Sequence, residues 1–128
     1  MQNIAARIVS QSDKYSHITP ILKSLHLLPL KARILFKILL LMFKSVNGLA
    51  PDYLCKLAVA YVPSRSLRSA DKLLLRVPQA RCKTLGDRAF SISGPREWNK
   101  LPLEIRKAES VNAFKCLLKS YLFNMFYN

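Results

Sequence analysis

The sequence predicts a mainly α-helical protein with one β-hairpin, an α+β fold in a single small domain of residues 1–128. Three observations predict this class. Residues 31–46 are apolar with helical spacing, residues 72–85 alternate between two faces as strands do, and residues 111–125 carry one apolar helical face. A length of 128 residues with 51% hydrophobic content suffices for a modest core. We therefore expect a central helix packed by short helices, the hairpin and the C-terminal helix.

Residues 1–62 are expected to form the helical part of the domain. Apolar residues recur at helical spacing in residues 2–10, which predicts a first short helix. A second helix is expected over residues 20–27, because Pro20 fits the first position of a helix. Residues 51–60 open with another proline and predict a further short helix.

The central helix is expected over residues 31–46, and Asn47-Gly48 follows with the chemistry of a helix end. Its apolar side chains cover most of the circumference, so most of the helix should be buried. Its basic residues fall within about 40° of one another at helical spacing, in a narrow stripe of Arg33, Lys37 and Lys44. We interpret this stripe as the solvent edge of a core helix in preference to a track for phosphates.

Residues 63–88 are expected to form a basic loop followed by a hairpin. Strands before and after a turn at 78–80 would form the hairpin of residues 72–85. This stretch holds seven basic and two acidic residues, the densest positive charge in the chain. The candidate nucleic-acid-binding residues lie mainly here: Arg65, Arg68, Lys72, Arg76, Arg81, Lys83, Arg88 and, further along, Arg96.

Residues 89–128 are expected to form a turn that contains the single tryptophan and then the C-terminal helix. Gly94-Pro95 predicts a turn, and Trp98 is then expected on a short turn or helix that ends at Pro102. We interpret Phe90 and Trp98 as inward-pointing structural anchors, with base stacking by exposed rings as the alternative. Ser110 is a good cap for the helix that follows it.

The net charge of +14, from 21 Lys and Arg against 7 Asp and Glu, is the feature that bears most on function. Such a chain attracts polyanions, so the candidate partners are RNA or DNA and anionic membrane surfaces. A solvated basic surface that only keeps the protein in solution is an equally open interpretation of residues 63–88.

Catalysis, metals and cofactors have no candidate residues in the sequence. The acidic residues are isolated, whereas polymerase and nuclease sites need clustered carboxylates for divalent cations. No phosphate-binding glycine loop occurs, and no small-molecule substrate is indicated. Three widely spaced cysteines and no secretory signal predict an intracellular protein, cytoplasmic or nuclear and not secreted. The longest apolar run, 38–43, is too short for a transmembrane segment.

Ten short motifs carry a resemblance to a known family. Their order is Gln2-Asn-x-Ala-Ala-Arg7, His17-Ile-Thr-Pro20, Leu25-His-x-Leu-Pro29, Phe36-Lys-Ile-Leu-Leu40, Asn47-Gly-Leu-Ala-Pro51, Ser64-Arg-Ser-Leu-Arg-Ser69, Val77-Pro78, Gly86-Asp-Arg88, Pro95-Arg-x-Trp-Asn99 and Leu101-Pro102, with Ala113-Phe-Lys115 after them. This pattern resembles the C-terminal tail of reverse transcriptase polyproteins from LINE-type (non-LTR) retrotransposons of the Rex-like and chicken-repeat-like clades. Leu27 departs from it, because the family usually has tryptophan there.

The resemblance implies a tail that lacks the endonuclease and polymerase domains of its parent. Such a polyprotein nicks DNA and reverse-transcribes its own RNA, and the tail could help to hold the template. The first hypothesis is thus a non-catalytic module that binds RNA or DNA through basic residues. The alternatives are a structural fragment that packs on the parental reverse transcriptase domain in cis without independent activity, and a basic protein that binds membrane surfaces.

Overall fold

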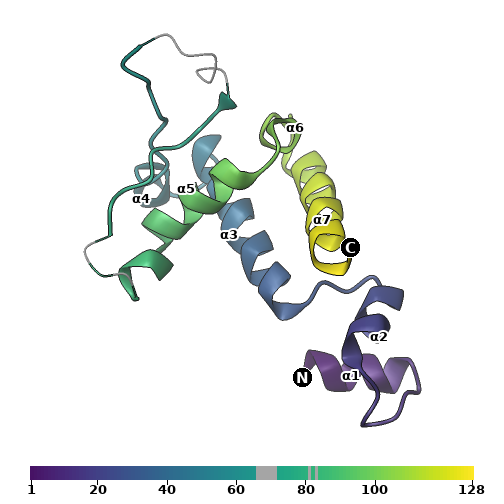
Figure 1. Ribbon diagram of the computed structural model, residues 1–128. Helices are drawn as coiled ribbons and strands as arrows, with labels where there is room; N and C mark the ends of the chain where they lie inside the picture. The colour runs from purple at the N-terminus through teal and green to yellow at the C-terminus, as the bar shows by residue number, and fades with distance from the viewer. Residues whose placement is uncertain (66–71, 81, 83) are drawn as a thin grey trace.

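The computed structural model describes residues 1–65, 72–80, 82 and 84–128. Helices dominate this part of the chain (Figure 1). In chain order they are α1 (Gln2–Val9), α2 (Ile18–Ser24), α3 (Leu30–Val46), α4 (Asp52–Cys55), the 3-10 helix η2 (Gly86–Arg88), α5 (Phe90–Lys100), α6 (Leu103–Arg106) and α7 (Val111–Tyr127). The helices expected over 2–10, 20–27, 31–46 and 111–125 are confirmed with small shifts of their ends. The helix expected over 51–60 is the four-residue α4.

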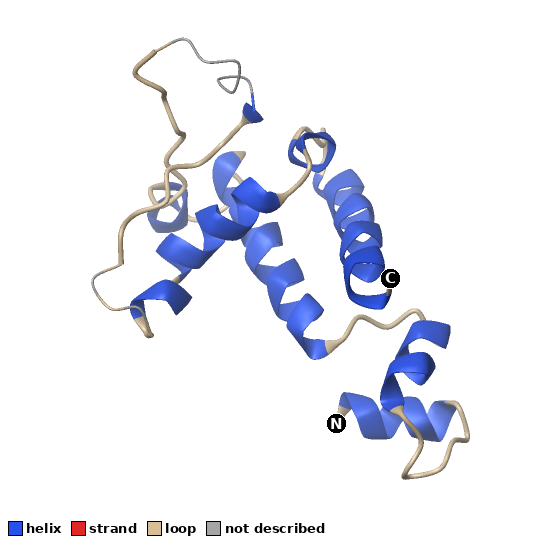
Figure 2. Cartoon of the chain, viewed as in Figure 1, coloured by secondary structure: helices blue, strands red, loops and turns tan. Residues whose placement is uncertain are grey.

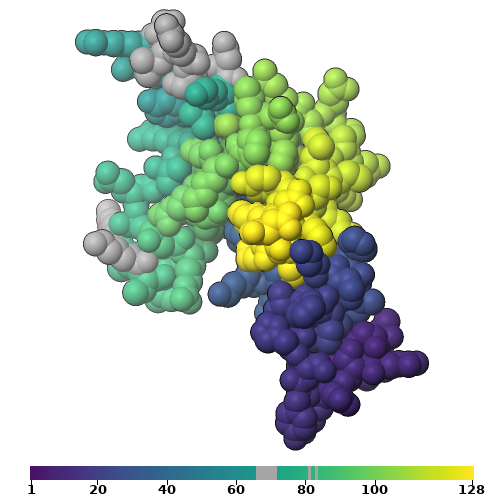
Figure 3. All heavy atoms as spheres, turned by 45° about the vertical axis from the view of Figure 1, so that its right-hand side comes forward, coloured from purple at the N-terminus to yellow at the C-terminus, as the bar shows by residue number. Residues whose placement is uncertain are grey.

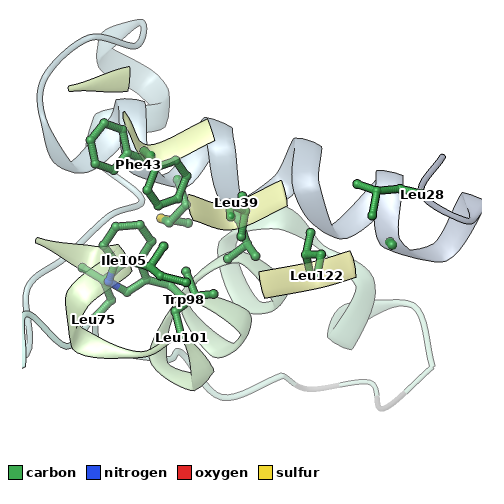
Figure 4. Close-up of a cluster of buried hydrophobic side chains, with 12 residues drawn as sticks. Leu28, Leu39, Phe43, Leu75, Trp98, Leu101, Ile105 and Leu122 are labelled. Atoms are coloured by element: carbon green, nitrogen blue, oxygen red, sulfur yellow. The ribbon is translucent and has the colours of Figure 1, made fainter. Parts of the chain in front are cut away.

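The core lies where α3 packs against α5 and α7 (Figure 1). One aromatic ring from each helix meets there: Phe43 stacks on Phe114 with 4.2 Å between ring centroids, and Trp98 lies 6.0 Å from Phe114. Figure 4 shows Trp98 grouped with Leu75, Leu101 and Ile105 at one end of this core. The central helix is therefore buried against two later helices, as its apolar circumference predicts.

Helix α5 corrects the expectation of a turn at Gly94-Pro95, and Trp98 lies on a helix, which was one of its two expected settings. The helix runs through Gly94 and Pro95, and the tryptophan lies on its third turn. Proline has a helix-compatible φ, and its missing N–H removes one intrahelical hydrogen bond. Ile92, Gly94, Pro95 and Trp98 are all buried on this helix, and a Cβ at position 94 would overlap Cε of Met42 on α3. Close packing against α3 thus outweighs the local turn signal.

The expected hairpin over 72–85, and with it the α+β class, is wrong. The described residues contain no strand or sheet, only an isolated antiparallel bridge between Ala60 and Leu75 (Figure 2). Residues 74–76 pair with residues 59–61, which lie before the basic loop and not after it. Residues 84–88 continue instead into a turn and η2. The protein is mainly α-helical.

Helices α1 and α2 form a separate lobe at the end of the molecule away from α4 and α5 (Figure 3). The two helices pack on each other, and residues 25–29 lead from α2 to α3. Only Ala6 of α1 is buried, whereas Ile4 and Ile8 are 62% and 71% exposed. This lobe therefore adds little to the main core. No helix in the described ranges is long and apolar enough to cross a membrane.

Candidate nucleic-acid interface

Residues 72–76, the clamped segment, are held by side chains of α5 and α6 that bind its backbone. Trp98 donates from Nε1 to the carbonyl of Leu73 at 3.0 Å. Asn99 accepts from the N–H of Leu75 at 2.9 Å and donates to the carbonyl of the same residue at 2.8 Å. Arg106 donates to the carbonyl of Lys72. The backbone of residues 72, 73 and 75 is thus fixed to the helical core.

The opposite edge of the clamped segment is paired as well. Tyr61 donates its N–H to the carbonyl of Leu74 at 2.9 Å, and Arg76 donates its N–H to the carbonyl of Val59 at 2.8 Å. The amide of Asn99 therefore takes the place that a second neighbouring strand would have. This explains the missing hairpin, because both edges of residues 74–76 already have partners.

Arg106 is the buried cation of this arrangement. The residue is 8% exposed, and burial lowers the pKa of its guanidinium because the charged form loses hydration. Its Nε has no hydrogen-bond partner among the described residues. The carbonyl of Lys72 is the acceptor that compensates this charge in part. Arg106 is accordingly a structural cation beneath the segment and is not on its exposed side.

The structure places the described candidate residues unequally. Lys72 and Arg76 are exposed on the clamped segment, and Arg65 and Arg88 are exposed on either side of it in the sequence. Arg96 lies on α5 and forms an ion pair with Asp87 at 3.0 Å, with both side chains partly exposed. The remaining candidates lie outside the described residues: Arg68, Arg81 and Lys83.

The two candidate anchors differ in burial. Trp98 is 1% exposed and donates its indole N–H to the protein, so its ring is closed to a stacked base. Phe90 is half-buried against the same core. Binding of nucleic acid at this surface would therefore depend on charge and not on these rings.

The positive charge of this surface has few internal partners. Across the described residues two ion pairs form, Arg96 with Asp87 and Lys100 with Glu97 at 2.7 Å. Lys72, Arg76 and Arg88 form none with a described carboxylate. The same part of the chain contains no cluster of three or more His, Cys, Asp or Glu that could hold a metal ion. The chemistry available here is contact with an anion.

Asn99 on α5 and Arg106 on α6 hold the clamped segment in place, and the sequence did not single them out. Asn99 belongs to the Pro95-Arg-x-Trp-Asn motif, which the sequence shows. Nothing in that motif indicates that the amide of Asn99 pairs with a backbone 24 positions away. Arg106 has no signal in the sequence beyond its position after Pro102. The motif is explained by backbone recognition, because its Trp and Asn bind main-chain groups of residues 73 and 75.

Comparisons of the chain with known proteins found no relative. No family model, no curated protein and no solved structure matches the chain. The resemblance to LINE-type polyproteins thus rests on the ordered motifs of the sequence.

Proposed function

We propose that this chain is a non-catalytic helical module, derived from the tail of a LINE-type reverse transcriptase, that binds RNA or DNA electrostatically. One observation carries the proposal: Lys72 and Arg76 are exposed on a segment whose backbone is fixed on both edges. A fixed backbone loses little conformational freedom on binding, so the attraction of these cations for phosphate is not offset by ordering of the chain. Arg65 and Arg88 extend the positive surface.

The charge balance supports a polyanionic partner. The chain has a net charge of +14, and few of its described cations are neutralised internally. Cations of this kind bind the phosphates of nucleic acid and release condensed counterions, which makes the affinity fall with salt. Arginine can also contact a phosphate with two N–H groups at once. Such contacts position the nucleic acid without reading its bases.

Salt-dependent binding to single-stranded RNA and to duplex DNA tests the proposal. The doubly substituted variant Lys72→Gln with Arg76→Gln should lower the log-log salt slope by up to about 2, since each phosphate contact contributes about 0.7 to 0.9. The matched control is Lys14→Gln with Lys31→Gln, which removes the same charge from exposed positions in the N-terminal third of the chain. The control should keep most of the slope.

Two outcomes would overturn this proposal. Equal losses in both variants would show that net charge, and not the clamped segment, determines binding. Binding that is absent, or that does not change with salt, would remove the electrostatic mechanism itself.

An exposed apolar stripe on α3 favours a second candidate, a structural fragment that packs on the parental reverse transcriptase domain. Leu30, Ile34 and Leu41 are 66%, 52% and 42% exposed and lie within about 40° around the helix. Lys37 lies between Ile34 and Leu41 on this face, so the stripe is apolar with one cation inside it, and exposed apolar groups of this kind are a feature of interaction sites. If a partner covers the stripe, the isolated chain should self-associate in light scattering, and Ile34→Glu with Leu41→Glu should abolish this.

A further inference from the structure

A second candidate site lies in the N-terminal third of the chain, in a cavity of about 730 Å³. Its walls come from α1, from the residues that link α2 to α3, from α3 and from α7. The wall residues that matter most here are apolar: Ala5, Val9, Leu25, Leu28 and Phe36. The volume lies within the range of small-molecule sites, about 300 to 1,000 Å³.

The linker that forms one wall is fixed from two sides. Gln2 of α1 donates from Nε2 to the carbonyl of Leu28 at 2.8 Å, and the hydroxyl of Tyr127 at the end of α7 donates to the carbonyl of Leu27 at 2.6 Å. Directly before these two linker residues, His26 has a φ of 50° and lies against the ring of Phe123 with 5.5 Å between centroids. The cavity is thus largely pre-formed and does not depend on a mobile wall.

Three exposed cations line the same cavity. Arg33 and Lys37 are four residues apart on α3 and so project from one face of that helix, and Lys119 comes from α7. None of them forms an ion pair with an acidic residue that the structure describes, and no such residue lines the cavity. The site therefore combines an apolar interior with unneutralised positive charge.

We propose that this cavity binds a single-chain amphiphile with an anionic headgroup, of the fatty-acid class. An alkyl chain would remove the apolar walls from water, which is the main source of affinity in such sites. The headgroup would contact Arg33, Lys37 and Lys119, and charge complementarity is what selects an anion over a neutral or cationic amphiphile. The proposal is independent of the nucleic-acid interface, because the two sites share no residue.

Calorimetry with four ligands of equal chain length tests the headgroup. Dodecanoate and dodecyl phosphate should bind, dodecanol more weakly, and dodecyltrimethylammonium at least about tenfold more weakly than dodecanoate, because a like charge meets three cations. All are used below the concentrations at which they form micelles. Equal affinity for the anionic and the cationic ligand would overturn the proposal.

Substitutions on α3 and α7 test the cations. Lys37→Gln with Lys119→Gln should weaken dodecanoate about tenfold and leave dodecanol nearly unchanged, since only the headgroup contact is lost. The matched control is Lys44→Gln with Lys115→Gln, which removes the same charge from the same helices outside the cavity. An equal effect of both pairs would contradict a site at the cavity.

A space-filling substitution tests the interior. Ala5 is exposed and lines the cavity, so Ala5→Trp should abolish dodecanoate binding while every cation remains. Asn112→Trp, at an exposed position of α7, is the control and should bind normally. Val9→Trp is the second cavity variant in case Ala5→Trp does not fold, and circular dichroism checks each variant.

Anionic vesicles separate the cavity from adsorption at a bilayer. The folded cavity variants and the natural chain are compared for binding to dodecanoate and to anionic vesicles. If the variants still bind dodecanoate and bind vesicles as well as the natural chain does, the ligand adsorbs at the surface and the proposal is overturned. We expect the cavity variants to lose dodecanoate binding. Their binding to RNA should equal that of the natural chain, so this experiment does not decide the nucleic-acid proposal.

Discussion

The two ends of the molecule differ in how their aromatic rings are buried and their backbone groups are paired. At the end with α5 and α6, Trp98 is 1% exposed. Side chains of α5 and α6 bind one edge of the clamped segment, and the backbone of residues 59 and 61 binds the other. At the end with α1 and α2, Ile4 and Leu30 are 62% and 66% exposed and a cavity remains between the helices. We call the first the closed end, because its rings are buried and its backbone is paired, and the second the open end, because a cavity remains between its helices.

This difference assigns different roles to the two ends. Burial of rings and pairing of backbone groups provide most of the stability of a small domain. A lobe with few buried side chains contributes less, and ligand-binding parts of proteins are drawn from such regions. The closed end is thus the stable framework of the protein. A bound molecule would increase the stability of the open end most.

Removal of the tryptophan should have the largest effect, because it opens the closed end. Trp98→Ala removes a fully buried ring and the donor to Leu73, and we expect a loss of about 3 to 5 kcal/mol in the free energy of unfolding. Trp98→Phe keeps an aromatic ring and should lose less. Urea denaturation followed by circular dichroism measures both, and a loss below about 1 kcal/mol for alanine would contradict the role of this ring in the core.

Asn99→Ala should have an intermediate effect, because it leaves the framework helices but releases one edge of the clamped segment. The N–H and carbonyl of Leu75 would lose their partners, at a cost of about 2 kcal/mol. Hydrogen exchange at the Leu75 amide should accelerate more than exchange in α3.

Two variants control this measurement. Asn99→Asp keeps the acceptor for the Leu75 N–H and should lie between alanine and the natural residue. Asn112→Ala removes an exposed amide from α7 and should change stability by less than about 0.5 kcal/mol. If the exchange rate of the Leu75 amide is unchanged in Asn99→Ala, the side chain of Asn99 does not fix the segment, and the two ends do not differ in the way described.

The smallest effect is expected at the open end, from the hydroxyl of Tyr127. Burial raises the pKa of this phenol above its ordinary value of 10.0, because the phenolate loses hydration. The folded state thus holds the proton more tightly. The contribution of this group is complete below pH 10 and is lost as the pH rises from 10 toward the folded-state pKa.

Tyr127→Phe isolates this contribution from the titration of other groups. The variant should lose no more than about 1 kcal/mol at neutral pH, the worth of one hydrogen bond to the carbonyl of Leu27. The difference in stability from the natural chain should shrink above pH 10. Thermal unfolding at pH 8 to 11 measures it, and a pH-independent difference would show that the phenol is not linked to folding.

Helical periodicity predicted the long helices, whereas close packing at Gly94 and competition for backbone groups explain where the prediction failed. Residues 31–46 and 111–125 form α3 and α7, because a long apolar face needs burial wherever it packs. The alternation in residues 72–85 predicted a strand with Leu73, Leu75 and Val77 on one face, but only Leu75 is buried, and the partner of a strand is a tertiary property. Leu75 meets Asn99 and Ala60, 24 and 15 positions away, and neither pairing has a local signal.

The sequence predicted which basic residues belong to the candidate nucleic-acid interface, but it did not predict how they are placed in space. Charge density indicated the basic region, and Lys72, Arg76 and Arg88 are exposed within it. The ion pair of Arg96 with Asp87 could not be foreseen, since nine positions separate them across η2 and α5. The cavity with Arg33, Lys37 and Lys119 was also hidden, because the basic stripe of one helix gives no indication of the concave surface beside it.

The clamp binds main-chain atoms only. Trp98, Asn99 and Arg106 contact the carbonyls and the N–H of residues 72, 73 and 75, and no side chain of the segment takes part in these bonds. The exposed side chains of Lys72 and Arg76 can thus be exchanged without loss of these hydrogen bonds. The charge at these two positions is therefore separable from the stability of the framework that carries them.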